Sequence, residues 1–191
     1  MRICVFGASS SALDPVYLEA GERLGRELAR RGHSLVFGGG ANGLMGAVAR
    51  GVSSGGGAIL GVAPGFFNVD GVLYDRCTEF IYTETMRERK QIMEDRSDAV
   101  VMTPGGIGTL EEFFEMLTLK QLGRHARPIA VLNTAGYFDE LQAMLETAAA
   151  QRFMEPATLA LYRSFVEPEP LLNYLENVRE TAAKPEEMKK I

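Results

Sequence analysis

The chain has 191 residues, of which 46% are hydrophobic and 24% are charged, and its formal net charge at pH 7 is −5. These values are typical of a soluble globular protein with one domain and a substantial core. The acidic balance excludes the basic character of a general nucleic-acid binder, and no apolar run reaches the ~20 residues of a membrane span, so we expect neither partner.

Short apolar runs alternate with amphipathic stretches along the chain. The predicted strands are residues 2–6, 34–37, 58–63, 78–82, 99–102, 129–132 and 164–166. The predicted helices are residues 17–31, 44–52, 87–96, 110–122, 138–152 and 171–181. Residues 66–75 form the longest predicted loop, and the charged tail 182–191 is expected to fray.

The order of these elements predicts the fold class. Strands that alternate with helices, without hairpin turns, pair in parallel through right-handed crossovers. Continuous apolar runs such as Ala-Val-Val-Met in 99–102 are typical of strands buried on both faces. We therefore expect a single Rossmann-like α/β domain over residues 1–181, an open parallel sheet with helices on both faces. Ligands of such sheets bind at the carboxyl ends of the strands.

Glycine is over-represented, with 21 residues, about 11% of the chain against a usual ~7%. The turn after 34–37 runs from Gly38 to Gly43 and matches G-x-G-x-x-G between a strand and a helix. A dinucleotide site also needs an acid at the end of the next strand, and none occurs before Asp70. This absence disfavours a dinucleotide site, which leaves two main interpretations: the glycines serve either tight turning and packing alone or contact with a phosphorylated ligand.

A second glycine turn, Thr103-Pro104-Gly105-Gly106-Ile107-Gly108-Thr109, follows the strand 99–102. Glycines at the start of a helix leave backbone N–H groups free for an anion, and the helix dipole assists. Hydroxyl groups of Thr109, Ser9 and Ser10 add donors. The pattern predicts a site for a phosphate-sized anion. Because no Lys follows the glycines as in a P-loop, it does not indicate nucleoside triphosphate hydrolysis.

Two charged segments near this turn each allow two interpretations. Thr109 and Glu112 fit a T-x-x-E capping box, in which the Glu only satisfies the helix N-terminus. Alternatively, the Glu112 carboxylate polarises water or stabilises cationic charge beside the anion. In Arg87-Glu88-Arg89-Lys90, Arg89 and Lys90 share a helical face with Met86 and Met93. This run is either a solvated face or a cluster facing an anion at the same sheet edge.

The scarce cysteines and histidines limit metal and redox chemistry. Cys4 and Cys77 lack C-x-x-C spacing, which predicts neither a disulfide framework nor a structural zinc site. His33 and His125 are isolated from acidic or thiol clusters, which disfavours a His-based metal centre and a His-led triad. We expect no metal and no cofactor. With no signal-peptide pattern in the sequence, we expect a reduced, cytoplasmic compartment.

These motifs resemble those of the Lonely Guy (LOG) family. Residues 104–112 match its P-G-G-x-G-T-x-x-E signature, residues 86–93 resemble its M-H-x-R-K-x-x-M segment, and residues 38–46 resemble its other glycine turn. The likeness continues through residues 121–137. Members are cytokinin riboside 5′-monophosphate phosphoribohydrolases, long mislabelled as lysine decarboxylases. The resemblance implies hydrolysis of the N-glycosidic bond of adenosine 5′-monophosphates, N6-modified or plain, to free base (cytokinin or adenine) and ribose 5-phosphate.

The resemblance implies that Arg89 and Glu112 form the catalytic pair. Together with the glycine turns, it predicts that the substrate contacts are Ser9, Gly39, Gly40, Gly43, Met45, Met86, Lys90, Gly105, Gly106, Ile107, Gly108, Thr109, Leu110, Glu111 and Thr118. The chain departs from the family pattern at Arg87, where the segment usually has His. A second departure is the acid that the preceding loop commonly offers, for which the nearest match is Asp70.

Two alternative functions and one partner remain open at the level of sequence. The alternatives are a general nucleotide 5′-monophosphate nucleosidase and a non-catalytic nucleotide or cofactor carrier of the same fold, which would need the anion site without Arg89 and Glu112.

The predicted helix 110–122 is apolar almost all round, so more than one of its faces must be covered. The domain's own helices or a second copy could do this; we expect a homodimer that shares the pocket walls.

Overall fold

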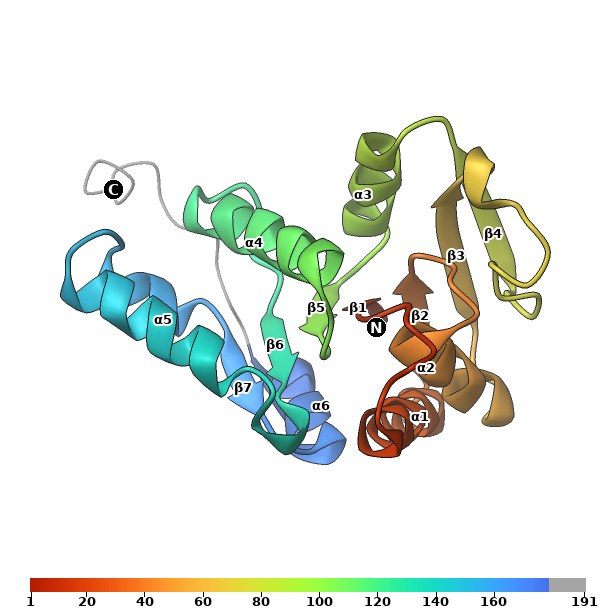
Figure 1. Cartoon of the computed structure of the whole chain (residues 1–191), viewed down its shortest axis with the longest axis horizontal. Coiled ribbons are helices and arrows are strands. Elements are labelled where there is room, and N and C mark those ends of the chain that lie inside the picture. Colours follow the sequence, from red (N-terminus) through yellow and green to blue (C-terminus); the bar gives the residue numbers. More distant parts are fainter. Residues whose placement is uncertain (179–191) are drawn as a thin grey trace.

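The structure, a computed structural model, describes residues 1–178. Within them, seven parallel strands form one sheet in the order β4-β3-β2-β1-β5-β6-β7 (Figure 1). The strands are β1 Arg2–Phe6, β2 Ser34–Phe37, β3 Ile59–Pro64, β4 Glu79–Thr83, β5 Ala99–Met102, β6 Ile129–Leu132 and β7 Arg163–Phe165. The expected Rossmann-like sheet is confirmed.

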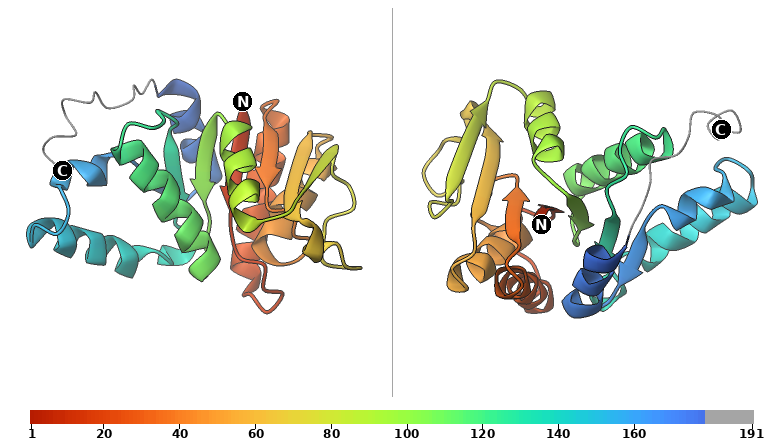
Figure 2. Two further views of the ribbon diagram at one scale, coloured as in Figure 1. Left: turned by 90° about the horizontal axis from the view of Figure 1, so that it is seen from above. Right: turned by 180° about the vertical axis from the view of Figure 1, so that it is seen from behind.

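The α-helices are α1 Pro15–Arg30, α2 Gly43–Ser54, α3 Met86–Asp95, α4 Ile107–Gln121, α5 Asp139–Ala150 and α6 Pro168–Asn177. Short 3-10 turns occur at η1 Gly65–Phe67, η2 Thr134–Gly136 and η3 Pro156–Ala160. Helices α1, α2 and α6 cover one face of the sheet, and α3 and α4 lie on the other (Figures 1 and 2). Among residues 1–178, no helix combines the length and apolar character needed to cross a bilayer.

Two apolar clusters, one on each face, hold these layers together. Because successive side chains of a strand point to opposite faces, Ile3 and Val5 join the cluster with α1, α2 and α6. Cys4 and Phe6 join the cluster with α3, α4 and α5. Burial on both faces explains why the strands are apolar without alternation.

The predicted bounds are closest for the strands, and three helix starts differ by two or three residues. Helix α1 begins at Pro15, because Asp14 caps it by accepting from the N–H of Val16 and proline suits the first turn. Helix α6 likewise begins at Pro168. Helix α4 begins at Ile107 rather than 110, within the glycine turn. Residues 179–181 of the last predicted helix and the predicted tail 182–191 lie outside the described residues.

The strand order also fixes where a ligand site can form. The chain runs outward from β1 through β2, β3 and β4, and then crosses back to continue with β5, β6 and β7. The switch point is therefore between β1 and β5, and a crevice opens there at the carboxyl ends of the strands. The turns that leave β1, β2 and β5 meet at this point.

Candidate active site

A cleft of about 680 Å³ lies at the carboxyl ends of β1, β2 and β5. Its walls are the turn after β1, the glycine turn after β2, the loop after β3, and the first turns of α3 and α4. The lining residues are Gly7, Ala8, Ser9, Ser10, Gly38, Gly40, Asn42, Met45, Phe67, Val72, Leu73, Met86, Arg89, Gly106, Ile107, Gly108, Thr109 and Glu112. The two glycine turns predicted to share one sheet edge therefore do so.

An ion pair between Arg89 and Glu112 joins α3 to α4 in the wall of the cleft. The Arg89 Nη2 atom lies 3.0 Å from Glu112 Oε1, and the two side chains are only 10% and 9% exposed. Arg89 also donates from Nε to the carbonyl oxygen of Val62, 3.2 Å away. A buried charge is stable only when paired and hydrogen-bonded in this way.

Burial changes the acidity of Glu112. Desolvation is the largest effect and raises its pKa to about 7, although Arg89, the next-largest influence, opposes the rise. Glu111 and Glu115 raise this pKa further, and Lys90 lowers it. A carboxyl group with a pKa near neutrality in a cleft is suited to accept a proton at physiological pH.

The capping interpretation of Glu112 is wrong. The N-cap of α4 is Gly106, so Thr109 already lies inside the helix, and the Glu112 carboxylate pairs with Arg89 instead of a backbone N–H. A capping box does occur, at the start of α3. There the N–H of Glu88 donates to Thr85 Oγ1, and the N–H of Thr85 donates to a Glu88 carboxylate oxygen.

The charged run that includes Glu88 is thus not a uniformly solvated face. Arg89 is buried and lines the cleft, whereas Glu88 caps its own helix. The neighbouring Lys90 forms ion pairs with Glu111 and with Glu115, whose Oε2 lies 2.8 Å from Lys90 Nζ. Lys90 and Glu115 border a smaller hollow of about 330 Å³ that Glu112 also borders.

The first turn of α4 presents backbone N–H groups to the cleft. Gly106, Ile107, Gly108 and Thr109 all line it. The first N–H groups of a helix have no intrahelical acceptor, and in α4 the bond from the N–H of Leu110 to the carbonyl of Gly106 is the first such contact. A Cβ atom at Gly106 or Gly108 would meet nothing within 4 Å. An anion can therefore approach this backbone closely.

In the glycine turn after β2, some glycines fit the packing interpretation and others fit contact with a ligand. Gly39 and Gly43 have φ of +78° and +60° and lie outside the cleft lining, against Phe80 and the carbonyl of Ala8. The carbonyl of Ala8 also accepts from the N–H groups of Leu44 and Met45, which occupies the start of α2. Packing explains these glycines, whereas Gly38 and Gly40 line the cleft.

Ten of the seventeen predicted site residues line the cleft. They are Arg89, Glu112, Ser9, Gly40, Met45, Met86, Gly106, Ile107, Gly108 and Thr109. The lining does not include Gly39, Gly43, Lys90, Gly105, Leu110, Glu111 or Thr118. Gly105 instead supports the turn, since a Cβ atom there would overlap Thr109 Oγ1.

The loop after β3 supplies lining residues that the sequence did not predict. It folds back on the glycine turn, where the N–H of Tyr74 donates to the carbonyl of Gly39 at 2.8 Å. This brings Phe67, Val72 and Leu73 into the cleft, while the candidate loop acid Asp70 does not line it. Such long-range pairing has no local signal; the run of apolar residues in 66–73 is the one hint.

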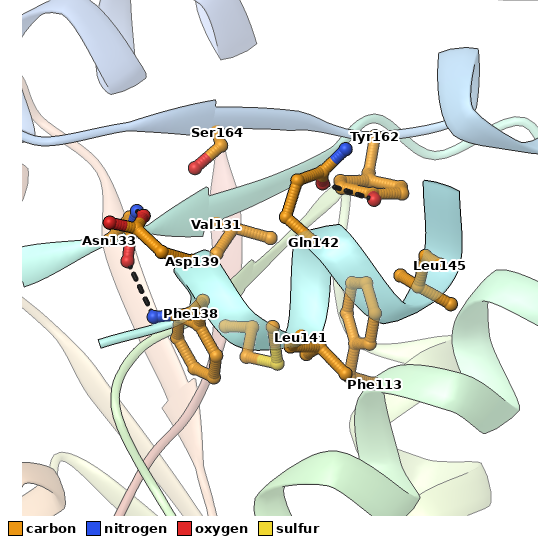
Figure 3. Close-up of a pocket in the computed structure, with 11 residues that line it drawn as sticks. Phe113, Val131, Asn133, Phe138, Asp139, Leu141, Gln142, Leu145, Tyr162 and Ser164 are labelled. Carbon is orange, nitrogen blue, oxygen red and sulfur yellow. Dashed lines mark hydrogen bonds between the residues drawn. The ribbon is translucent and has the colours of Figure 1, made fainter. Parts of the chain in front are cut away.

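A separate cavity of about 220 Å³ lies between α4, α5 and the strands β5, β6 and β7 (Figure 3). Two pairs of its polar side chains are hydrogen-bonded to each other: Asn133 Nδ2 donates to Asp139 Oδ1 at 2.7 Å, and the Tyr162 hydroxyl donates to Gln142 Oε1 at 2.6 Å. The remaining lining is mostly apolar, so the charged cleft beside Arg89 is the better candidate for catalysis.

Comparisons with known proteins show which family the sequence resembles. Residues 45–175 match the family model described as "Possible lysine decarboxylase". A "Probable cytokinin riboside 5'-monophosphate phosphoribohydrolase" of Oryza sativa subsp. japonica is 43% identical over 92% of this chain and 77% of its own length. A cytokinin riboside 5'-monophosphate phosphoribohydrolase of Arabidopsis thaliana is 39% identical over 92% of this chain and 81% of its own.

Solved structures support the fold alone. The molybdenum cofactor binding protein of Rippkaea orientalis superposes with a TM-score of 0.71 at 23% identity, covering 92% of this chain and 94% of that one. The molybdenum cofactor carrier protein of Chlamydomonas reinhardtii also gives 0.71 at 23%, covering 92% and 95%. The family model and the relatives at about 40% identity span most of the sequence, and the chain belongs to the Lonely Guy (LOG) family.

Proposed function

We propose that this protein hydrolyses the N-glycosidic bond of adenosine 5′-monophosphates, N6-modified or plain, and releases the free base and ribose 5-phosphate. The observation that carries the proposal is the buried Arg89–Glu112 pair beside the open N-terminus of α4 in one cleft. The two relatives described above are named for this reaction on cytokinin riboside 5′-monophosphates.

The first turn of α4 binds the 5′-phosphate in this proposal. The free N–H groups at Ile107, Gly108 and Thr109 and the positive end of the helix dipole suit a dianion. The phosphate does not react, so its binding energy serves to position the ribose carbon that does. The charge of Glu112 in the same helix then lies near the ribose rather than the phosphate.

Glu112 drives the bond cleavage. The C1′–N bond breaks with its electron pair going to the base, which leaves an oxocarbenium-like ribose that a carboxylate stabilises. The oxygen of a water molecule bonds to C1′ and its proton passes to Glu112. The departing base takes a proton from solvent, and Glu112 then returns its own proton to solvent. Arg89 holds the carboxylate in place through the 3.0 Å contact and faces the ribose and the base from α3.

The lysines of the described residues do not fit a pyridoxal phosphate decarboxylase, which needs a lysine for its Schiff base. Lys90 is ion-paired with Glu111 and Glu115. Lys120 is buried and donates from Nζ to the carbonyl of Leu161 at 2.8 Å. Neither lines the cleft. The other three lysines, at positions 184, 189 and 190, lie beyond residue 178.

A homodimer completes the proposal. Of the residues in α5, only Ala149 is buried, and Met144 on its outer surface is 64% exposed. Phe153, just beyond α5, is 84% exposed. A second copy packed against α4 and α5 would cover these side chains. The free thiols of Cys4 and Cys77 suit the reducing conditions of the cytoplasm.

One assay tests the function. The protein is incubated with AMP, N6-isopentenyl-AMP, the two corresponding nucleosides, and pyrimidine and guanine 5′-monophosphates, and the free base is measured by chromatography. We expect release from the two adenine nucleotides and none from the nucleosides. Equal release from pyrimidine and guanine 5′-monophosphates would favour a general nucleosidase. Release from nucleosides would contradict the phosphate site, and no release from any substrate would favour a non-catalytic carrier.

A further inference from the structure

Gly38, the residue directly after β2, lies against the guanidinium group of Arg89. A Cβ atom at position 38 would overlap Arg89 Nη2 and lie 3.0 Å from Cζ and 3.4 Å from Nε. These three atoms are its nearest neighbours, and all belong to Arg89. Any side chain at position 38 would therefore compete with the guanidinium for the same space.

Each nitrogen of the guanidinium already has a neighbour. Its Nε donates to the carbonyl of Val62 at 3.2 Å, its Nη2 meets Glu112 Oε1 at 3.0 Å, and its Nη1 lies 3.9 Å from the sulfur of Met86. Gly38 lies beside the same group, which still borders the cleft. Since the end of an arginine side chain is flexible, a larger residue at 38 would push it away from these partners and leave the backbone in place.

The backbone at Gly38 does not itself require glycine. Its φ is not in the left-handed region, unlike that of the next residue, Gly39, at +78°. An alanine at 38 therefore avoids the strain of a positive φ. The three atoms nearest to a Cβ at this position, all of Arg89, are the obstacle to a side chain.

We propose that Gly38 is a positioning residue, whose missing side chain seats the Arg89 guanidinium against Glu112 and the carbonyl of Val62. Its effect on catalysis rests on the proposed function. The steric dependence of Arg89 on Gly38 does not, and it can be measured without substrate.

The first test compares Gly38→Ala with Gly65→Ala. Gly65 follows β3, is exposed, lies outside the cleft lining, and its Cβ would meet only the carbonyl of Thr83 at 4.0 Å. Both variants remove the same backbone freedom. We expect Gly38→Ala to lower kcat on the order of 100-fold, as a misplaced catalytic group does, with KM for AMP or N6-isopentenyl-AMP little changed. Gly65→Ala should behave as the wild type.

The pH profile separates positioning from general damage. Arg89 lowers the pKa of Glu112, so a displaced guanidinium moves the acidic limb of kcat to higher pH in Gly38→Ala. A variant that is only partly folded would lose activity without this shift. An unchanged kcat, or a lower kcat with an unchanged limb, would overturn the proposal.

The second test is a thermal double-mutant cycle with Arg89→Ala. We expect Gly38→Ala to lower Tm by about 4 °C in the wild-type background and not to lower it when Arg89 is already alanine. An equal loss in both backgrounds would overturn the proposal. If Gly38→Ala alone does not fold, the double variant must fold. Should the wild type release no base, the proposed function fails and this cycle still decides the role of Gly38.

Discussion

Glu112 Oε1 lies 3.0 Å from Arg89 Nη2, which joins consecutive helices α3 and α4 on the same face of the sheet. The pair is buried, yet both residues line the cleft. The carboxylate is therefore held in one orientation while it remains in reach of a ligand. An anion site alone would need neither the buried carboxylate nor its arginine partner, which is why we assign the pair to the proposed reaction.

Glu112→Gln keeps the size of the side chain and removes the proton acceptor. We expect kcat for base release to fall about 100- to 10,000-fold, with AMP still bound, because the proposed phosphate contacts lie in the first turn of α4. The measurement is base release together with calorimetric titration of AMP. Glu115→Gln, an exposed position on the same helix, is the matched control. Near-normal turnover of Glu112→Gln would refute the assignment.

The pH dependence of the reaction follows from the pKa of Glu112. The group must be ionised to accept a proton, and burial raises its pKa to about 7. We expect kcat to fall as the pH drops through about 7, measured between pH 5 and 9. Arg89 and Lys90 from α3 lower this pKa, and Glu111 and Glu115 from α4 raise it. A flat profile from pH 5.5 to 8 would show that another group accepts the proton.

The same pKa predicts a pH-dependent stability. In the folded state the pKa of Glu112 is raised from 4.5 to about 7. The stability that the protonated carboxyl group contributes to the folded state is therefore fully present below pH 4.5, and it is lost as the pH rises through 7. The loss is on the order of 3 kcal/mol. Glu112→Gln carries no such charge. We expect the two proteins to be similar in stability near pH 4.5 and the variant to be more stable at pH 8.

Urea denaturation at pH 5 and pH 8 measures this difference. Other titrating groups are common to both proteins and largely cancel in the comparison. A difference in the free energy of unfolding that does not change with pH would mean that Glu112 is already ionised at pH 5 in the folded protein.

The sequence predicted the architecture well because its signals are local. Apolar runs identified 2–6, 34–37, 99–102 and 129–132 with the observed bounds. The start of α4 was missed by three residues, because Gly105, Gly106 and Gly108 suppress the helical signal where the helix begins.

The site was predictable only in part, since its contacts are between distant segments. Arg89 and Glu112 were paired through the family resemblance and not through spacing, and the structure brings them together. The apolar wall from Phe67, Val72 and Leu73 depends on hydrogen bonds between the loop and the glycine turn. Nothing in either segment alone indicates that pairing.

Lys90 offers a test of where the nucleotide contacts end. The family resemblance predicts that it touches the nucleotide, whereas its Nζ is paired with Glu111 and Glu115 outside the cleft lining. On that geometry Lys90→Met should change KM for AMP by less than about threefold and cost up to about 1 kcal/mol of stability. Steady-state kinetics and urea denaturation measure both. A tenfold or larger rise in KM, with stability unchanged, would instead support the contact between Lys90 and the nucleotide that the resemblance predicts.

Met144→Glu tests the homodimer. Met144 is 64% exposed on α5, and a buried, unpaired carboxylate at an interface costs several kcal/mol. We expect the wild type to sediment as a dimer and the variant to shift to monomer in analytical ultracentrifugation. Val16→Glu places the same charge on a 42% exposed apolar residue of α1, across the sheet from α4, and should leave the dimer intact. A wild type that stays monomeric at high concentration, or a Met144→Glu variant that stays dimeric, would rule out this interface.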